Sequence, residues 1–354
     1  MTVSVFDHPI LSGLLGEEKL APLFTARAEI DALLRFEAAL AEAEAEEGVI
    51  PQKAAQAIAS VLAGFHPDVA ALKTGTARDG VMVPALLAQL REKLAAVHRP
   101  CLHFGATSQD AIDTGLALRL NAAMQQLGAR LDQLVEALEA LERRDGGLEV
   151  MAHTRMQAAI VVPAGRKIRA WREPLARHRI RLETVAQSVA ILSFGGAAGT
   201  LDKLGEKAPS VAARLADKLG LRLVAHARHS ERDAAGDFAA LLSLITGSLG
   251  KMGQDIALMA QSEVDTLRLA GAGGSSAMAH KKNPVKAEAL VALARFNATL
   301  LSGMHQALVH ENERSGAAWT LEWMLLPQMV MAAGAALRLA GEAVEGMSFV
   351  ARKE

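Results

Sequence analysis

The chain has 354 residues, of which 51% are hydrophobic but only 3% are aromatic, and it lacks tyrosine. Its 38 basic and 39 acidic residues nearly cancel, which argues against a nucleic-acid-binding surface or a polybasic membrane face. No uncharged apolar run reaches membrane-spanning length, so we predict that neither nucleic acid nor a membrane is a partner. Cys101 is the only cysteine, which rules out an intrachain disulfide and favours a cytoplasmic location.

Prolines punctuate the first hundred residues, which we interpret as a small helical domain spanning residues 1–100. Within it, apolar residues at helical spacing predict a helix over residues 28–47, which Gly48 ends. The stripe that predicts this helix contains Ile30, Leu33, Leu34, Glu37 and Leu40. A second helix is expected over residues 51–63.

Long proline-free stretches follow, over residues 101–162, 210–283 and 285–326. They carry apolar residues three and four apart, which is typical of long helices packed in a bundle. The stripes are Leu131, Leu134, Val135, Leu138 and Leu141; Leu242, Ile245, Leu249, Met252, Ile256 and Met259; and Leu290, Leu293, Leu300 and Met304, with Asn297 among them. Gly247, Gly250 and Gly253 cost helix stability, which a close approach of another helix would explain.

These patterns predict an all-α fold whose central domain, residues 101–345, is a long-helix bundle. The helices are too long and too apolar for one small monomer, so we expect the bundle to be shared between subunits. A large monomeric bundle is the alternative. The chain is expected to end with an Ala-rich helix over residues 327–346 and a short tail, residues 346–354.

The most distinctive stretch reads GAGGSSAMAHKKNPV and covers residues 271–285. Its glycines permit unusual backbone shapes, Asn283 is a favourable helix N-cap, and Pro284 suits the first helical position. A polar loop that leads into a helix N-terminus favours anions, and Lys281 and Lys282 strengthen that preference. The pattern indicates hydroxyl-mediated proton transfer beside a bound carboxylate. An ordinary flexible surface loop is the alternative.

This loop resembles the signature loop of the fumarase/aspartase superfamily, whose pattern is Gly-Ser-Ser-x-Met-Pro-x-Lys-x-Asn. The matching residues are Gly274, Ser275, Ser276, Met278, Lys281 and Asn283, whereas Ala279 replaces the family proline. The resemblance implies a cofactor-free, long-helix enzyme that forms a homotetramer with active sites built from several subunits. It also implies that Ser275 and Lys281 are catalytic and that Ser276, Met278 and Asn283 contact the substrate. The superfamily's usual third, C-terminal domain is expected to be largely absent.

Residues 103–114 read HFGATSQDAIDT, in which Thr107 and Ser108 can cap a helix. Taken alone, the run reads as a well-capped helix start. It is also similar to the superfamily's first conserved region, with matches at His103, Gly105, Thr107, Ser108 and Asp110. The resemblance implies that Thr107 and Ser108 bind a substrate carboxylate and that His103 lies nearby.

Residues 151–163 depart from the pattern Gly-Arg-Thr-His-x-Gln that lyases of the superfamily carry. Thr154 and Gln157 match, but His153 stands at the arginine position and Arg155 at the histidine position. An arginine does not exchange protons near neutral pH, although it can hold a carboxylate with two hydrogen bonds. We infer that this end of the substrate needs no proton and carries an extra negative charge. Arg155 is predicted to hold that charge as a catalytic residue, with His153, Thr154 and Gln157 as substrate contacts. A solvated helix start is the alternative.

Two later segments resemble the cycloisomerase branch of the superfamily. FGGAAGTL, residues 194–201, lacks the glycine spacing of a dinucleotide fingerprint and is similar to a run in that branch. HENERSGAAWTLEW, residues 310–323, follows the same branch and adds Arg314 as a substrate contact, while Trp319 and Trp323 are expected to pack. The sequence holds no recognisable metal-ligand motif. The charged run HSERD, residues 229–233, reads by itself as surface ion pairs.

The resemblance to this branch implies that the chain closes a tricarboxylate, 3-carboxy-cis,cis-muconate, to a carboxymuconolactone. Such a reaction belongs to the breakdown of aromatic acids such as protocatechuate by the beta-ketoadipate pathway. Two alternatives stay open: a fumarate-releasing lyase for argininosuccinate- or adenylosuccinate-like substrates, and a non-catalytic helical scaffold. Arg155 counts against the lyase, and the intact match at Ser275, Lys281 and Asn283 counts against the scaffold.

Overall fold

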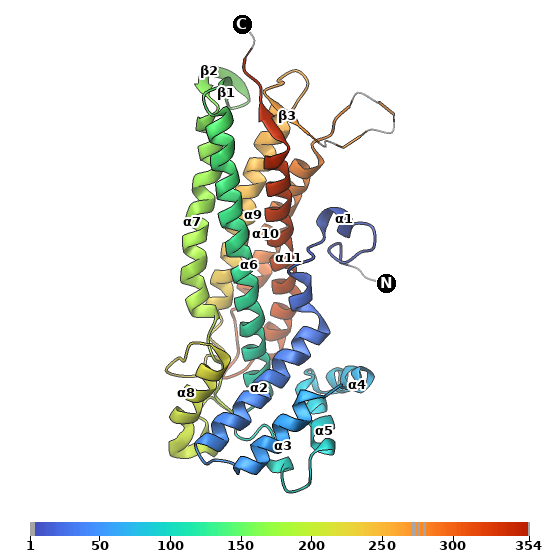
Figure 1. The fold of residues 1–354 in the computed structure, drawn as a ribbon, viewed down its shortest axis with the longest axis vertical. Helices are drawn as coiled ribbons and strands as arrows, with labels where there is room; N and C mark the ends of the chain where they lie inside the picture. Colours follow the sequence, from blue (N-terminus) through green and yellow to red (C-terminus); the bar gives the residue numbers. More distant parts are fainter. Residues whose placement is uncertain (1–3, 271–272, 275–276, 279–280, 353–354) are drawn as a thin grey trace.

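The computed structural model describes residues 4–270, 273–274, 277–278 and 281–352. It is an elongated helical bundle with small antiparallel sheets at one end (Figure 1). The helices are α1 (Ser12–Leu15), α2 (Ala26–Glu46), α3 (Gln52–Ala63), α4 (Val69–Asp79), α5 (Val83–Lys93), α6 (Ser108–Asp145), α7 (Gly165–Val189), α8 (Ala208–Leu219), α9 (Asp233–Met259), α10 (Val285–Gln306) and α11 (Gly316–Glu345). The strands are β1 (Glu149–Thr154), β2 (Gln157–Pro163), β3 (Leu267–Leu269) and β4 (Met347–Phe349). The predicted all-α long-helix architecture is confirmed.

The long helices α6, α7, α9, α10 and α11 run side by side (Figure 1). Their predicted apolar stripes form the core, because every predicted residue of the α9 seam is buried, as are most of those on α6 and α10. Asn297, which falls on the α10 stripe, is fully buried, and its side chain donates to the Met329 carbonyl at 3.2 Å. One hydrophobic cluster therefore runs along the bundle and joins α10 to α11.

Helices α2, α3, α5 and α8 surround a second hydrophobic cluster at the opposite end from the small sheets (Figure 1). Helix α2 starts where the Thr25 hydroxyl accepts a hydrogen bond from Ala28 N at 3.2 Å, within two residues of the predicted start. The cluster takes members from both sides of residue 100, including Leu192 and Phe194. The division of the chain at residues 100 and 345 stays a prediction.

Two predicted helix starts are wrong. Helix α11 begins at Gly316, because the Ser315 hydroxyl caps it by accepting from Ala318 N, and Pro327 lies inside the helix. A buried helix can continue through an interior proline when packing outweighs the lost hydrogen bond. Helix α10 begins at Val285, so Asn283 is not its cap, and its side chain instead donates to the Gly274 carbonyl at 3.1 Å.

The segment that follows α11 extends the fold beyond the helices. Strand β4 pairs antiparallel with β3, with Leu267 opposite Phe349, and so attaches the end of the chain to the segment that follows α9. Among the described residues, α11 is the helix whose length and apolarity would suffice to cross a membrane. However, 67% of its most apolar window is buried inside the bundle, as in the core helix of a globular protein.

The glycines of α9 differ in what surrounds them. A Cβ atom on Gly250 would lie 2.4 Å from the Ala294 side chain, and one on Gly253 would lie 2.6 Å from the Ala287 carbonyl. Both contacts come from α10, so the predicted close approach of a neighbouring helix is confirmed at these positions. Around Gly247, no described atom outside its own helical surroundings lies within 4 Å of such a Cβ.

This contrast predicts opposite effects of the same substitution. Gly253→Ala should lower the stability by about 1–3 kcal/mol, because the added methyl group forces α9 and α10 apart. Gly247→Ala should be neutral or should stabilise by up to about 1 kcal/mol, since alanine favours the helix. Thermal unfolding at matched protein concentration would compare them, and equal midpoints for the two variants would contradict the packing described here.

Candidate active site

The start of α6 carries the first group of predicted site residues. Thr107 is the N-cap, Ser108 is the first helical residue, and Thr107 and Asp110 form a capping box in which Asp110 Oδ2 accepts from Thr107 N at 2.9 Å. The capping expected from the sequence is confirmed. Both hydroxyl-bearing residues are partly exposed at a helix N-terminus, where backbone N–H groups favour an anion.

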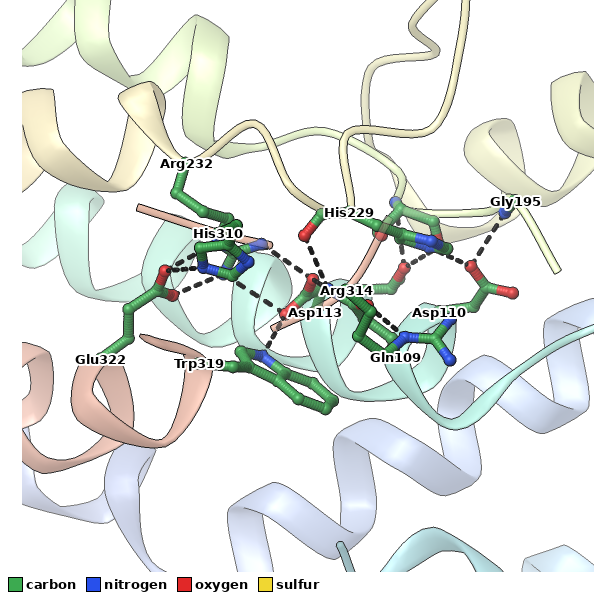
Figure 2. A network of polar contacts seen from close by, with 12 residues as sticks. Gln109, Asp110, Asp113, Gly195, His229, Arg232, His310, Arg314, Trp319 and Glu322 are labelled. Carbon is green, nitrogen blue, oxygen red and sulfur yellow. Dashed lines mark hydrogen bonds and ion pairs between the residues drawn. The ribbon is translucent and has the colours of Figure 1, made fainter. Parts of the chain in front are cut away.

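The Asp110 carboxylate binds two further segments to this helix start. Asp110 is completely buried and accepts from Gly195 N at 2.8 Å, from Gly196 N at 2.9 Å and from His229 Nε2 at 2.7 Å (Figure 2). Gly196 has φ 67°, and a Cβ there would lie 2.7 Å from the Gly105 carbonyl, so the turn requires glycine. The glycine-rich run at residues 194–201 therefore forms a turn that is hydrogen-bonded to the start of α6.

One helical turn further on, Asp113 enters a buried ion network (Figure 2). Arg232 donates to Asp113 Oδ2 at 2.8 Å and to Glu322 Oε2 at 2.6 Å, and Trp319 Nε1 donates to Asp113 Oδ1 at 3.0 Å. Burial by itself lowers the pKa of Arg232, but the two carboxylates outweigh burial and raise it. The alternative that the charged run at residues 229–233 forms surface ion pairs is wrong for Arg232, whose side chain is only 10% exposed. The packing role of Trp319 is confirmed.

Arg314 approaches the same helix start from the segment before α11. Its Nε donates to Gln109 Oε1 at 2.7 Å, and Gln109 in turn donates to the His229 carbonyl at 2.8 Å (Figure 2). Gln109 is buried, whereas Arg314 is exposed. A buried amide thus anchors one edge of an exposed guanidinium beside Thr107 and Ser108.

His103 lies on the approach to α6 with a left-handed backbone, φ 60°. Its Nδ1 lies 2.6 Å from Glu37 Oε1 on α2, and both side chains are largely buried. Burial lowers the pKa of His103, but the Glu37 carboxylate, aided by Asp110, outweighs burial and raises the pKa above its usual value. The contact with Glu37 thus favours the protonated form of His103, which lies four residues before the N-cap Thr107.

The second predicted group lies on a β-hairpin instead of a helix. Strand β1 ends at Thr154, β2 begins at Gln157, and the two-residue turn between them has φ 50° at Arg155 and 66° at Met156. Positive φ at both turn positions is normally supplied by Asn-Gly, so Arg-Met stores backbone strain there. His153, Thr154, Arg155 and Gln157 are all exposed, and the alternative of a solvated helix start is wrong.

A cavity of about 830 Å³ opens between this hairpin, α7 and α9. Arg155, Lys167 and Lys251 line it, and Asp255 faces them while it accepts from Trp171 Nε1 at 2.7 Å and pairs with Lys251. Burial and the charge of Lys251 lower the pKa of Lys167 against the opposing effect of Asp255. The lining of this cavity therefore carries more basic than acidic side chains.

The third predicted group is the signature loop, of which only part is described. Ser275 and Ser276 lie outside the described residues. Gly273 and Asn283 exchange backbone hydrogen bonds, at 2.9 and 2.8 Å, which close the base of the loop before α10. Lys281 is exposed, and its N–H donates to the Met278 carbonyl at 3.0 Å, while Met278 is 44% exposed.

One copy of the chain does not bring these three groups together. Helix α6 has 38 residues, which at 1.5 Å per residue separates the Thr107 end from the hairpin by about 57 Å. The hairpin and the start of α10, which follows the signature loop, lie toward one end of the bundle, and the start of α6 lies toward the other (Figure 1). The described residues contain no cluster of His, Cys, Asp and Glu suited to a metal ion.

Several side chains that build the helix-start group were not predicted as site residues. Gln109 and His229 link Arg314 and Asp110, and Glu37 contacts His103. Glu37 had a signal in the sequence, since a carboxylate occupies an apolar helical stripe and is only 2% exposed in the fold. The partner of each of these side chains is distant in sequence, so no local pattern could name it.

A long-helix bundle with polar loops at both ends is the architecture found in solved enzymes of the lyase superfamily. The family model described as "Lyase" matches residues 16–296. The chain belongs to this lyase family, and its fold is of the fumarase/aspartase type.

The curated relatives of the chain carry names that are more specific than the family description. A 3-carboxy-cis,cis-muconate cycloisomerase of Pseudomonas aeruginosa is 38% identical over 94% of this chain and 73% of its own. A protein of the same name from Bradyrhizobium diazoefficiens is 36% identical over 96% of this chain and 76% of its own. The crystal structure of the 3-carboxy-cis,cis-muconate lactonizing enzyme from Pseudomonas putida superposes with a TM-score of 0.91 at 35% identity, covering 97% of this chain and 78% of that one.

The ion network predicts a large loss of stability when Arg232 is removed. Arg232→Leu leaves Asp113 and Glu322 buried without their cation, which should cost about 3–5 kcal/mol in equilibrium unfolding near pH 7. Arg314→Leu is the control, because that guanidinium is exposed and its removal leaves only the Gln109 amide oxygen without a partner, so the loss should be clearly smaller. Equal losses for the two variants would contradict the buried-charge explanation.

Proposed function

We propose that the chain is a cofactor-free cycloisomerase that converts 3-carboxy-cis,cis-muconate to a carboxymuconolactone. The observation that carries the proposal is the match of nearly the whole chain to relatives bearing that name. The reaction belongs to the breakdown of protocatechuate and related aromatic acids by the beta-ketoadipate pathway, in the cytoplasm. The free, unpaired Cys101 is compatible with that reducing compartment.

The chemistry is an internal addition. One substrate carboxylate oxygen forms a bond to a carbon of a double bond conjugated with another carboxylate, and the π electrons move into that second carboxylate. The resulting aci-carboxylate dianion needs preorganised donors, for which we assign Lys281, Asn283 and the N-terminus of α10. The adjacent carbon then takes a proton, and Ser275 is the proposed donor, activated by the positive charge around it.

Arg155 has a binding role in this scheme. The nucleophile is part of the substrate and already anionic, so the opposite end of the reacting bond needs no acid. A guanidinium at the hairpin turn instead supplies a permanent charge for one of the three carboxylates. His103, Thr107, Ser108 and Arg314 would hold another carboxylate, with His153, Thr154, Gln157, Ser276 and Met278 as further contacts.

The separation of these groups supports a homotetramer whose active sites are shared. An antiparallel association through the long helices would place the hairpin end of one copy beside the α6 start of another. Apolar side chains are exposed on those helices, with Ile180 on α7 65% exposed, Leu244 on α9 50% and Met324 on α11 61%. The proposed association would cover these side chains.

The direct test mixes the purified protein with 3-carboxy-cis,cis-muconate, without added metal or nucleotide, and follows the absorbance of the conjugated diene. Loss of absorbance with formation of a lactone is expected. An unchanged diene with folded protein would reject the proposal. In that case amino-acid and nucleotide succinates would be tested for release of fumarate.

Ser275→Ala should lower kcat by about 10²–10⁴-fold, the usual contribution of a proton donor, and should leave the oligomer intact. The measurement is steady-state kinetics together with light scattering. Turnover equal to that of the unmodified enzyme would remove Ser275 from the mechanism.

Mixed oligomers test whether the sites are shared. Ser275→Ala alters the signature loop and Arg314→Leu alters the helix-start group, and each variant alone should be nearly inactive. After co-refolding in equal amounts, up to about one quarter of the sites should receive both unmodified residues from different copies, and activity should return accordingly. No recovery in mixtures that light scattering proves to be hybrid would show that the two groups do not meet in one site.

A further inference from the structure

The buried contact between Glu37 and His103 is not explained by packing alone. Glu37 is 2% exposed on α2, and its Oε1 lies 2.6 Å from His103 Nδ1, whereas its Oε2 has no hydrogen-bond partner among the described residues. A buried carboxylate is costly unless it is paired with a charge. The imidazole is therefore the group in direct contact with the Glu37 carboxylate, and this contact raises the pKa of His103.

A second carboxylate on the same helix provides a contrast. Glu44 lies two turns further along α2, is completely buried, and has no hydrogen-bond partner on either oxygen among the described residues. Burial, together with the charge of Glu37, raises the pKa of Glu44 to about 9. Glu44 is therefore a neutral carboxylic acid near pH 7, and among the described residues it has no imidazole contact of the kind that Glu37 makes.

The other charged groups that act on His103 come from two further helices. Asp110 on α6 favours the imidazolium, whereas Arg91 on α5 opposes it. Asp110 already accepts from His229 and from backbone N–H groups, so its charge is shared among several donors. Among the described residues, Glu37 is the partner that contacts the ring directly, through Nδ1.

We propose that Glu37 is a positioning residue that holds His103 by Nδ1, as an imidazolium, so that its Nε2–H serves the carboxylate-binding group at the start of α6. Together with Arg314, this would give that group two cations, of which the imidazolium depends on pH and the guanidinium does not. The inference rests on the proposed function, because it assigns His103 a substrate carboxylate as partner.

The test compares Glu37→Gln with Glu44→Gln, which are the same substitution on the same helix at two buried positions. Glu37→Gln removes the charge that holds the imidazolium. We expect KM for 3-carboxy-cis,cis-muconate to rise about tenfold or more at pH 8, a larger change than in kcat, and to recover partly toward pH 6. Glu44→Gln replaces a neutral acid with a neutral amide, so both constants and their pH profile should stay unchanged.

A direct observation of the ring separates this inference from the proposed function. In protein labelled with ¹³C at histidine Cε1, the His103 signal is identified by its loss in His103→Gln. Its titration midpoint should fall by about one pH unit or more in Glu37→Gln and stay in place in Glu44→Gln. If the unmodified protein does not consume the substrate, the proposed function fails, while this titration still decides the role of Glu37.

Glu37→Asp keeps the test valid if Glu37→Gln does not fold. The shorter carboxylate retains the charge but lengthens the contact, so the His103 midpoint and KM should fall between those of the unmodified protein and the charge-free variant. The proposal is overturned if removing or shortening Glu37 leaves the His103 titration unchanged. It is also overturned if Glu44→Gln alters KM and its pH profile as strongly as Glu37→Gln does.

Discussion

The Asp110 carboxylate is the interaction on which the helix-start group depends. Backbone N–H groups of Thr107, Gly195 and Gly196 and the ring of His229 all donate to it in a fully buried position. Each of these donors would lose its partner if the carboxylate moved, and an unpaired buried donor costs about 1–3 kcal/mol. The start of α6, the glycine turn and the segment before α9 are therefore held in one arrangement.

Asp113 repeats this arrangement one turn later and extends it to α9 and α11. Through Arg232 it reaches Glu322, and through its other oxygen it accepts from Trp319. Apolar packing of similar volume could stabilise these helices as well as ions do. Apolar side chains could not, however, replace the polar side chains at the start of α6, where Gln109 accepts a hydrogen bond from Arg314. The buried charges thus determine where the exposed ones lie.

The sequence predicted the bundle well because its signals are local. The α9 seam, the start of α2 and the Thr107 cap depend on residues three or four positions apart, and all are found as expected. The errors share one cause, which is that tertiary contacts override local preference. Pro327 favours a helix start but lies within α11, and Asn283 favours a cap but donates to the Gly274 carbonyl. The hairpin at Arg155 has no Asn-Gly turn, so no local pattern predicted it.

The sequence predicted the separate motifs of the candidate site, but it did not predict how they lie relative to one another. Sequence patterns named Thr107, Arg155 and Lys281, and nothing in those patterns reveals that α6 places the first about 57 Å from the second. The side chains that prepare the site, such as Glu37 and His229, act through partners far away in the sequence. Pairing across such distances is a property of the fold, which a local pattern does not encode.

The hairpin turn is where the proposed chemistry diverges from that of a lyase. An eliminating enzyme must protonate a leaving group, which requires a side chain that exchanges protons near neutral pH. Arg155 cannot do this, but it keeps its charge at every relevant pH and adds to the cationic lining formed with Lys167 and Lys251. A substrate that carries its own nucleophile needs binding of charge at this position and no acid. Under the proposed function, the exchange of histidine for arginine in the motif thus adapts a bundle suited to elimination for closing a ring.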